Sequence, residues 1–135
     1  MKYTLLYEPD LNRFTLTTFG ELSMSGIQEM LKALLTHEAW QKNRDLVVDH
    51  RQASFSKISP EEMKYLADTV VALDRRLGAR HCAIITPDDG ITKHAMYQYD
   101  VESRAELVNR TFLANEYDQA IQWLNSGIQK EAKLA

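Results

Sequence analysis

Three ionisable residues, Asp49, His50 and Arg51, follow directly after the apolar run Leu46–Val48. A carboxylate and an imidazole can act as general base and acid, and a guanidinium can bind an anion. Neighbouring residues on a strand point to opposite faces, so Asp49 and His50 cannot easily share one substrate. We therefore favour a binding site, in which Arg51 holds an anionic group and Asp49 orders the loop. In the alternative interpretation, Asp49 accepts hydrogen bonds from nearby backbone N–H groups while the other two side chains lie in solvent.

Further polar residues mark the starts of two predicted helices. Ser59 precedes Pro60 and is followed three residues later by Glu62, which is the spacing of a capping box. Thr86 ends an apolar run, and Thr92 lies just beyond the turn that follows it. Helix starts expose N–H groups that bind anions, and open α/β sheets hold ligands where strands end. The predicted ligand- or partner-binding residues are therefore Asp49, His50, Arg51, Ser59, Thr86 and Thr92.

Other candidates for catalysis or metal binding lack a suitable arrangement. The histidines, at positions 37, 50, 81 and 94, show no metal-ligand spacing. Asp88 and Asp89 are interpreted as turn and helix-capping residues. Cys82 lies inside an apolar run, where a thiol is usually inert. We expect no catalytic residue, metal or cofactor, and the protein is predicted not to be an enzyme.

Composition excludes several broad classes. The chain has 135 residues, 44% hydrophobic and 26% charged, which suits one globular domain. A net charge of −3 disfavours a general nucleic-acid binder. No apolar run approaches the roughly 20 residues of a membrane span, and the N-terminal apolar run is too short for a signal peptide. A single cysteine fits a reducing compartment, so we expect a cytoplasmic protein.

Hydrophobic periodicity predicts an α/β fold. We expect a hairpin of strands at 3–7 and 13–18, with Gly20 ending the second strand, and a helix from Ser23 or Ser25 toward Trp40. Strands at 46–49, 81–86 and 107–113 then alternate with helices at 60–77, 91–102 and 116–125. This β-β-α-β-α-β-α-β-α order predicts a single mixed, mostly parallel five-stranded sheet with four helices. The domain is expected to span residues 1–125, with a polar tail at 126–135.

Methionine and tyrosine residues are concentrated in the predicted helices. They could line an adaptable apolar cleft between the second and third helices, or they could form ordinary core. These residues are Met24, Met30, Met63, Met96, Tyr65, Tyr97 and Tyr99.

The predicted hairpin and the helix after Gly20 resemble STAS-like domains, the fold of bacterial anti-sigma-factor antagonists, and so do three short segments. They are the Leu-Val-Val-Asp-His-Arg run ending at Arg51, the Ile-Ser-Pro-Glu-Glu run starting at Ile58, and the ending from Phe112 to Leu124. The chain is similar to the antagonist-like subgroup that is grouped with lipid-binding CRAL-TRIO domains. In regulatory STAS domains a Ser or Thr just after the strand-ending Asp is phosphorylated. Asp49 matches that Asp, but His50 and Arg51 occupy the positions of the phosphoacceptor.

The resemblance implies a non-enzymatic binding or regulatory module acting through a protein partner or a small apolar or anionic ligand. A first alternative is an anti-sigma-factor antagonist switched by phosphorylation at Ser54, Ser56 or Ser59. A second is a small enzyme using Asp49 and His50 in acid–base chemistry. A homodimer through the hairpin edge or an apolar helix face is a further hypothesis.

Overall fold

The computed structural model describes the backbone of residues 1–103 and 109–134, and side chains except those at 70–77, 98, 100–103, 109 and 127–134. One mixed sheet of five strands forms the centre of this described chain, in the order β1-β2-β3-β4-β5. The first two strands pair antiparallel, and every later neighbour pairs parallel. The strands are β1 (Lys2–Glu8), β2 (Arg13–Glu21), β3 (Asp45–Ser54), β4 (Cys82–Thr86) and β5 (Asn109–Leu113). The predicted fold class is confirmed.

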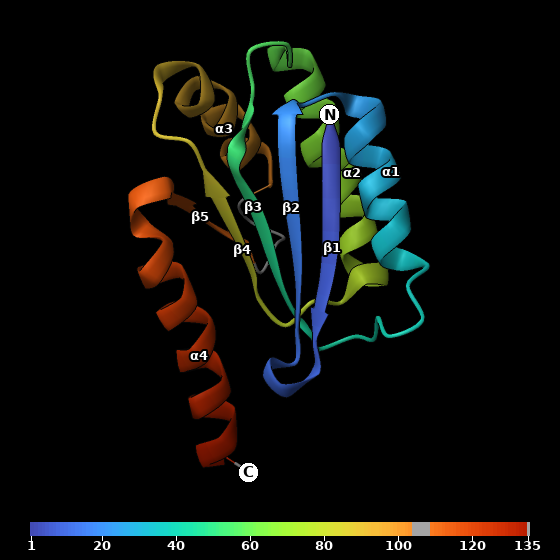
Figure 1. The fold of residues 1–135 in the computed structure, drawn as a ribbon, viewed down its shortest axis with the longest axis vertical. Coiled ribbons are helices and arrows are strands. Elements are labelled where there is room, and N and C mark those ends of the chain that lie inside the picture. The colour runs from blue at the N-terminus through green and yellow to red at the C-terminus, as the bar shows by residue number, and fades with distance from the viewer. Residues whose placement is uncertain (104–108, 135) are drawn as a thin grey trace.

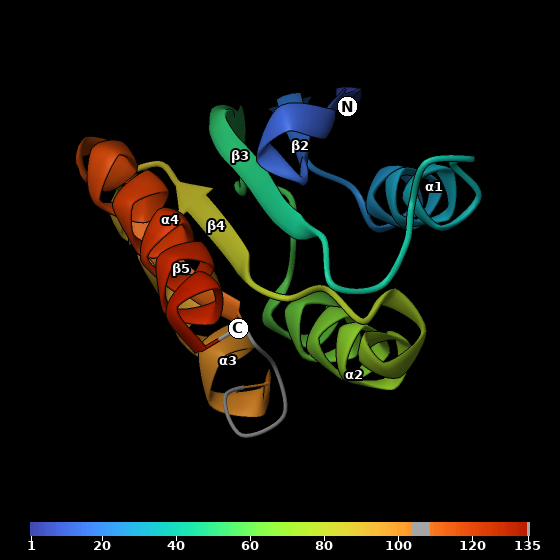
Figure 2. The same ribbon diagram turned by 90° about the horizontal axis from the view of Figure 1, so that it is seen from below.

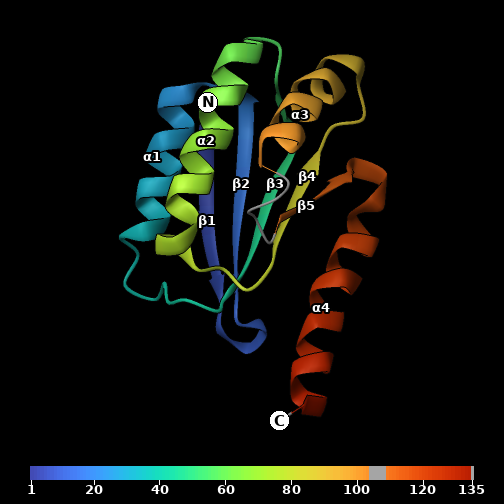
Figure 3. The same cartoon turned by 180° about the vertical axis from the view of Figure 1, so that it is seen from behind.

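Helices cover both faces of the sheet. In the described residues these are α1 (Met24–Leu35), α2 (Pro60–Leu77), α3 (Gly90–Ser103) and α4 (Tyr117–Leu134). The helices α1, α2 and α3 lie on one face, and α4 crosses the other face alone (Figures 1, 2 and 3). Short 3₁₀ turns, at Pro9–Leu11 and Ala114–Glu116, close the hairpin and precede α4. The sheet therefore separates two hydrophobic cores.

The larger core lies under α1, α2 and α3. Alternate residues of β3, Leu46 and Val48, point into it, while Val47 between them points to the α4 side. The smaller core joins Val47, Ala83, Ile85 and Phe112 to Ala120 and Leu124 of α4. A strand buried on both faces needs no polar alternation, which explains the continuous apolar run in β3.

The central strand β3 is longer than predicted, and this changes the position of the ionisable residues. It continues past Asp49 to Ser54 because β2 also continues and pairs with it: Phe19 lies opposite Gln52, and Gly20 opposite Ala53. The prediction that Gly20 ends the second strand was therefore wrong. Asp49, His50 and Arg51 lie within a strand rather than in a loop after it. The β2–β3 register shifts between Thr17 and Phe19, as in a β-bulge.

Two helix boundaries also differ from the sequence expectation. Helix α1 begins after Ser23, whose hydroxyl oxygen accepts a hydrogen bond from the Gly26 N–H at 3.1 Å. It ends at Leu35, well before Trp40, and the Thr36 hydroxyl donates to the Lys32 carbonyl at 2.8 Å. Helix α4 runs through the predicted tail to Leu134, because most residues after Gly127 favour helix.

Some predicted features lie outside the described residues. They are the start of the last strand at 107–108, the tail residue Ala135, and the predicted apolar side chains Val70, Val71, Leu73 and Leu77 of the second helix.

Candidate functional site

Asp49 and Arg51 form an ion pair on the face of the sheet that carries α4. The Arg51 Nη2 lies 2.8 Å from Asp49 Oδ2, and the Arg51 backbone N–H donates to Asp49 Oδ1 at 3.0 Å. The guanidinium also lies over the Tyr117 ring, 4.1 Å from its centroid. Burial opposes ionisation of Asp49, but the hydrogen bonds and charge of Arg51 outweigh it and hold the pKa of the carboxyl below its usual value. Arg51 is thus already engaged with a carboxylate and an aromatic ring.

His50 lies on the opposite face of β3 and is buried, with only 8% of its surface exposed. Its Nδ1 is 2.7 Å from the Thr18 hydroxyl on β2, and its ring meets Phe55 edge-on at 5.4 Å. Burial lowers the pKa of His50 to about 4, against a weaker opposing effect of the Asp49 charge. The imidazole is therefore neutral at physiological pH. The strand alternation separates Asp49 from His50, as the sequence argument expected.

His50 lines an apolar cavity between the sheet and helices α1, α2 and α3. The cavity measures about 80 Å³, which corresponds to room for about three water molecules at their volume of about 30 Å³ in the liquid. Its wall is almost entirely hydrocarbon and sulfur. The lining residues are Leu22, Ile27, Met30, Leu31, Leu46, Val48, His50, Phe55, Ile58, Met63, Leu66, Ala79, Cys82, Ile84, Met96 and Tyr99.

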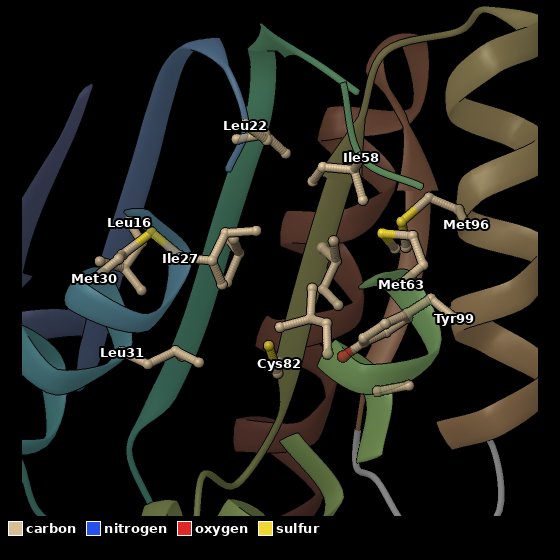
Figure 4. Packing of buried hydrophobic residues seen from close by; sticks show 14 of the residues in the cluster. Leu16, Leu22, Ile27, Met30, Leu31, Ile58, Met63, Cys82, Met96 and Tyr99 are labelled. Atoms are coloured by element: carbon tan, nitrogen blue, oxygen red, sulfur yellow. The ribbon is translucent and has the colours of Figure 1, made fainter. Parts of the chain in front are cut away.

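Side chains from all three helices meet around this cavity (Figure 4). Ile27, Met30 and Leu31 come from α1 on one side. Met63 of α2 and Met96 and Tyr99 of α3 face them from the other side. Met30, Met63, Met96 and Tyr99, which the sequence left as either cleft or ordinary core, line this cavity, and the cavity lies against the sheet rather than only between the second and third helices. Met24 is half-buried and packs against this core, whereas Tyr65 and Tyr97 are exposed and lie outside the cavity wall.

The remaining predicted site residues make local structural contacts. Ser59 and Glu62 form the expected capping box, each backbone N–H donating to the other's side chain at 3.1 Å. The Thr92 backbone N–H donates to Asp89 Oδ1 at 2.7 Å, so Asp89 caps α3. Thr86 is buried, and its hydroxyl lies 3.4 Å from the Phe112 carbonyl. A ligand role for Ser59, Thr86 and Thr92 stays a prediction.

Two outer clefts lie beside the cavity at the loop end of the sheet. One is lined by Ser54, Phe55, Ser56, Asp89, Gly90 and Ile91. The other is lined by Ile58, Pro60, Gly90, Ile91, His94 and Ala95. Phe55 belongs to the first cleft and Ile58 to the second, and both also belong to the cavity wall. Ile91, which is 61% exposed, lies in both clefts.

Sequence reasoning missed the residues that close the cavity. Phe55 and Ile58 are buried although they lie between polar residues, and an isolated apolar residue in a polar loop is the signal that could have found them. Thr18, the partner of His50, carries no such signal, because only the pairing of β2 with β3 brings the two together.

In the described part of the chain, no three His, Cys, Asp or Glu residues are grouped closely enough to hold a metal ion. The same part contains no helix with the length and hydrophobicity of a membrane span. Comparison with family models, curated proteins and solved structures found no match to this chain.

Proposed function

We propose that this protein is a non-enzymatic, STAS-like binding module that holds a small apolar ligand between its sheet and helices α1, α2 and α3. The observation that carries the proposal is the apolar cavity of about 80 Å³. Native interiors are close-packed, with few voids larger than a water molecule. An apolar cavity of this size stays dry and gains free energy when an apolar molecule fills it.

The loop end of the sheet supplies the access route. Phe55 is shared between the cavity wall and one outer cleft, and Ile58 between the cavity wall and the other, so the proposed ligand enters past these two side chains. Both belong to the connection between β3 and α2, which carries no sheet pairing after Ser54. The same end of the sheet is where the sequence predicted the binding site. The ligand position differs, because the apolar cavity lies on the His50 face and the Arg51 guanidinium lies on the other.

Native mass spectrometry of freshly purified protein would test ligand retention. We expect an adduct of a small apolar molecule that is present under gentle conditions and lost on denaturation. The denatured mass also tests the phospho-switch alternative, because covalent phosphate on Ser54, Ser56 or Ser59 would survive denaturation. Of these three serines, Ser56 is exposed, whereas Ser59 already caps α2.

A cavity-filling variant gives a sharper test with toluene as the probe. In Ile84→Phe, the larger ring should occupy the cavity and abolish toluene binding measured by isothermal titration calorimetry. The matched control is Ile85→Phe, the same change one residue later on the α4 side. It should cost about 1–3 kcal/mol of stability by overpacking and leave toluene binding intact. If the wild-type protein binds neither toluene nor another mainly apolar molecule of that size, the proposed function is wrong.

A further inference from the structure

Among the described residues of the cavity wall, His50 is a polar group with hydrogen-bonding capacity left over. The cavity wall also contains the Cys82 thiol and the Tyr99 hydroxyl. Both residues already interact with other residues. Within the described residues, the hydrogen bonding of the His50 ring consists of the contact between Nδ1 and the Thr18 hydroxyl. Its other nitrogen, Nε2, therefore has no protein partner there, although the side chain is more than nine-tenths buried.

The contacts of Thr18 favour one placement of the proton on the imidazole ring. The Thr18 oxygen lies 2.7 Å from His50 Nδ1 and 3.4 Å from the Asp49 carbonyl oxygen. A hydroxyl has one proton to donate, so it can serve the carbonyl only if Nδ1–H donates to the hydroxyl oxygen. This arrangement uses both contacts, whereas the opposite tautomer uses one. It leaves Nε2 unprotonated, with a lone pair that can accept a hydrogen bond.

The neutral state of the ring is consistent with this assignment. Burial lowers the pKa of His50 to about 4, so the Nε2 lone pair is available at neutral pH. Among the described residues of the cavity wall there is no lysine or arginine that could balance an anionic ligand. A lone pair facing an apolar wall is poorly solvated, so a ligand that donates one hydrogen bond to it gains free energy.

We infer that the ligand is a small apolar molecule carrying one hydroxyl group, and that this O–H donates a hydrogen bond to His50 Nε2. The inference rests on the proposed function, because it concerns the same cavity. It narrows the ligand class to small alcohols and phenols that can enter this cavity. Hydrocarbons of equal size would fill the space without satisfying His50.

Phenol and toluene form a matched pair of probes, because they differ by a hydroxyl in place of a methyl group. Isothermal titration calorimetry would measure both dissociation constants for the wild-type protein and for His50→Leu. We expect the variant to bind phenol about tenfold more weakly, which is the value of one buried hydrogen bond. Its affinity for toluene should change less than twofold. The change in the ratio between the two probes isolates the hydrogen bond from general hydrophobicity.

The outcomes separate this inference from the proposed function. If toluene binds and the leucine variant weakens both probes equally, the hydroxyl assignment is overturned and the cavity still binds apolar ligands. If neither probe binds to the wild-type protein, both proposals fail.

A measurement on the unaltered protein tests the proton assignment even if the leucine variant does not fold. The ¹⁵N chemical shifts of the His50 ring distinguish a protonated nitrogen from an unprotonated one. At pH 7 we expect Nδ1 to be protonated and Nε2 to be unprotonated. A proton on Nε2 would contradict the inference, since that nitrogen would then donate rather than accept.

Discussion

Adjacent residues of β3 face two chemically different environments. Asp49 and Arg51 satisfy each other beside Tyr117, where part of the pair reaches solvent. His50 points the other way, into the cavity wall, and remains neutral. Side chains that look like one catalytic cluster in the sequence are thus divided by the sheet itself. The protonation of His50 has a measurable consequence for the stability of the protein.

We predict that the wild-type protein loses stability as the pH falls from about 6.5 to about 4. The folded state keeps His50 neutral, with a pKa of about 4, whereas the unfolded chain binds a proton on this residue below about pH 6.5. The unfolded state therefore binds more protons in this window, and protonation favours unfolding as the pH falls. The full effect is about 3 kcal/mol in the free energy of unfolding.

Urea unfolding at a series of pH values would measure this effect. His50→Gln should give a flatter stability profile between pH 6.5 and pH 4 than the wild-type protein. The control is His94→Gln, which removes an exposed histidine and should keep the wild-type slope. An equal slope in wild type and His50→Gln would show that His50 is not buried in its neutral form.

At the scale of elements, the cap of α2 positions the cavity wall. Ser59 and Glu62 satisfy two backbone N–H groups at the helix start, and Met63 follows directly with 1% of its surface exposed. Ile58 immediately before the cap also lines the cavity. The start of α2 therefore sets where both of these wall residues lie.

We predict that Ser59→Ala lowers the free energy of unfolding by about 1 kcal/mol, because the Glu62 N–H loses its acceptor. Thermal unfolding followed by circular dichroism would record the change. The matched control is Ser56→Ala, three residues earlier in the same loop. Its hydroxyl is exposed and contacts Ser54, so its removal should leave the melting temperature nearly unchanged. Equal effects of the two substitutions would contradict the capping role.

At the scale of the whole molecule, one sheet separates two cores with different packing partners. Three helices share the face with the cavity, whereas α4 covers the other face, where Leu124 is fully buried. Ligand binding should therefore be sensitive to changes in one core and insensitive to equal changes in the other.

Met63→Ala and Leu124→Ala test this division. Each removes a buried side chain and should cost about 2–5 kcal/mol. Met63→Ala also enlarges the existing cavity, so toluene should raise its melting temperature more than that of the wild-type protein. Leu124→Ala opens space on the opposite face and should leave the toluene-dependent shift in the first core unchanged. If toluene raised the melting temperature of Leu124→Ala more than that of Met63→Ala, the binding site would lie on the α4 face of the sheet, and this prediction would be wrong.

Local patterns in the sequence determined the order of elements and several of their boundaries. Apolar runs without alternation marked β3 and β4, and the Ser59–Glu62 spacing predicted a capping box that the structure confirms. These features depend on residues close together in the chain, which is why they can be read locally. The opposite orientations of Asp49 and His50 also followed from strand geometry alone.

Only the tertiary structure decided what surrounds His50. The length of β3 depends on how far β2 pairs with it, and the Thr18–His50 contact joins residues 32 positions apart. The cavity wall draws side chains from the β-sheet, from three helices and from the loops between them. Its size is the difference between the space those elements enclose and the volume of their side chains, and no local pattern contains that difference. The cavity beside His50 therefore arises from packing, whereas the helices and strands that enclose it follow from local sequence patterns.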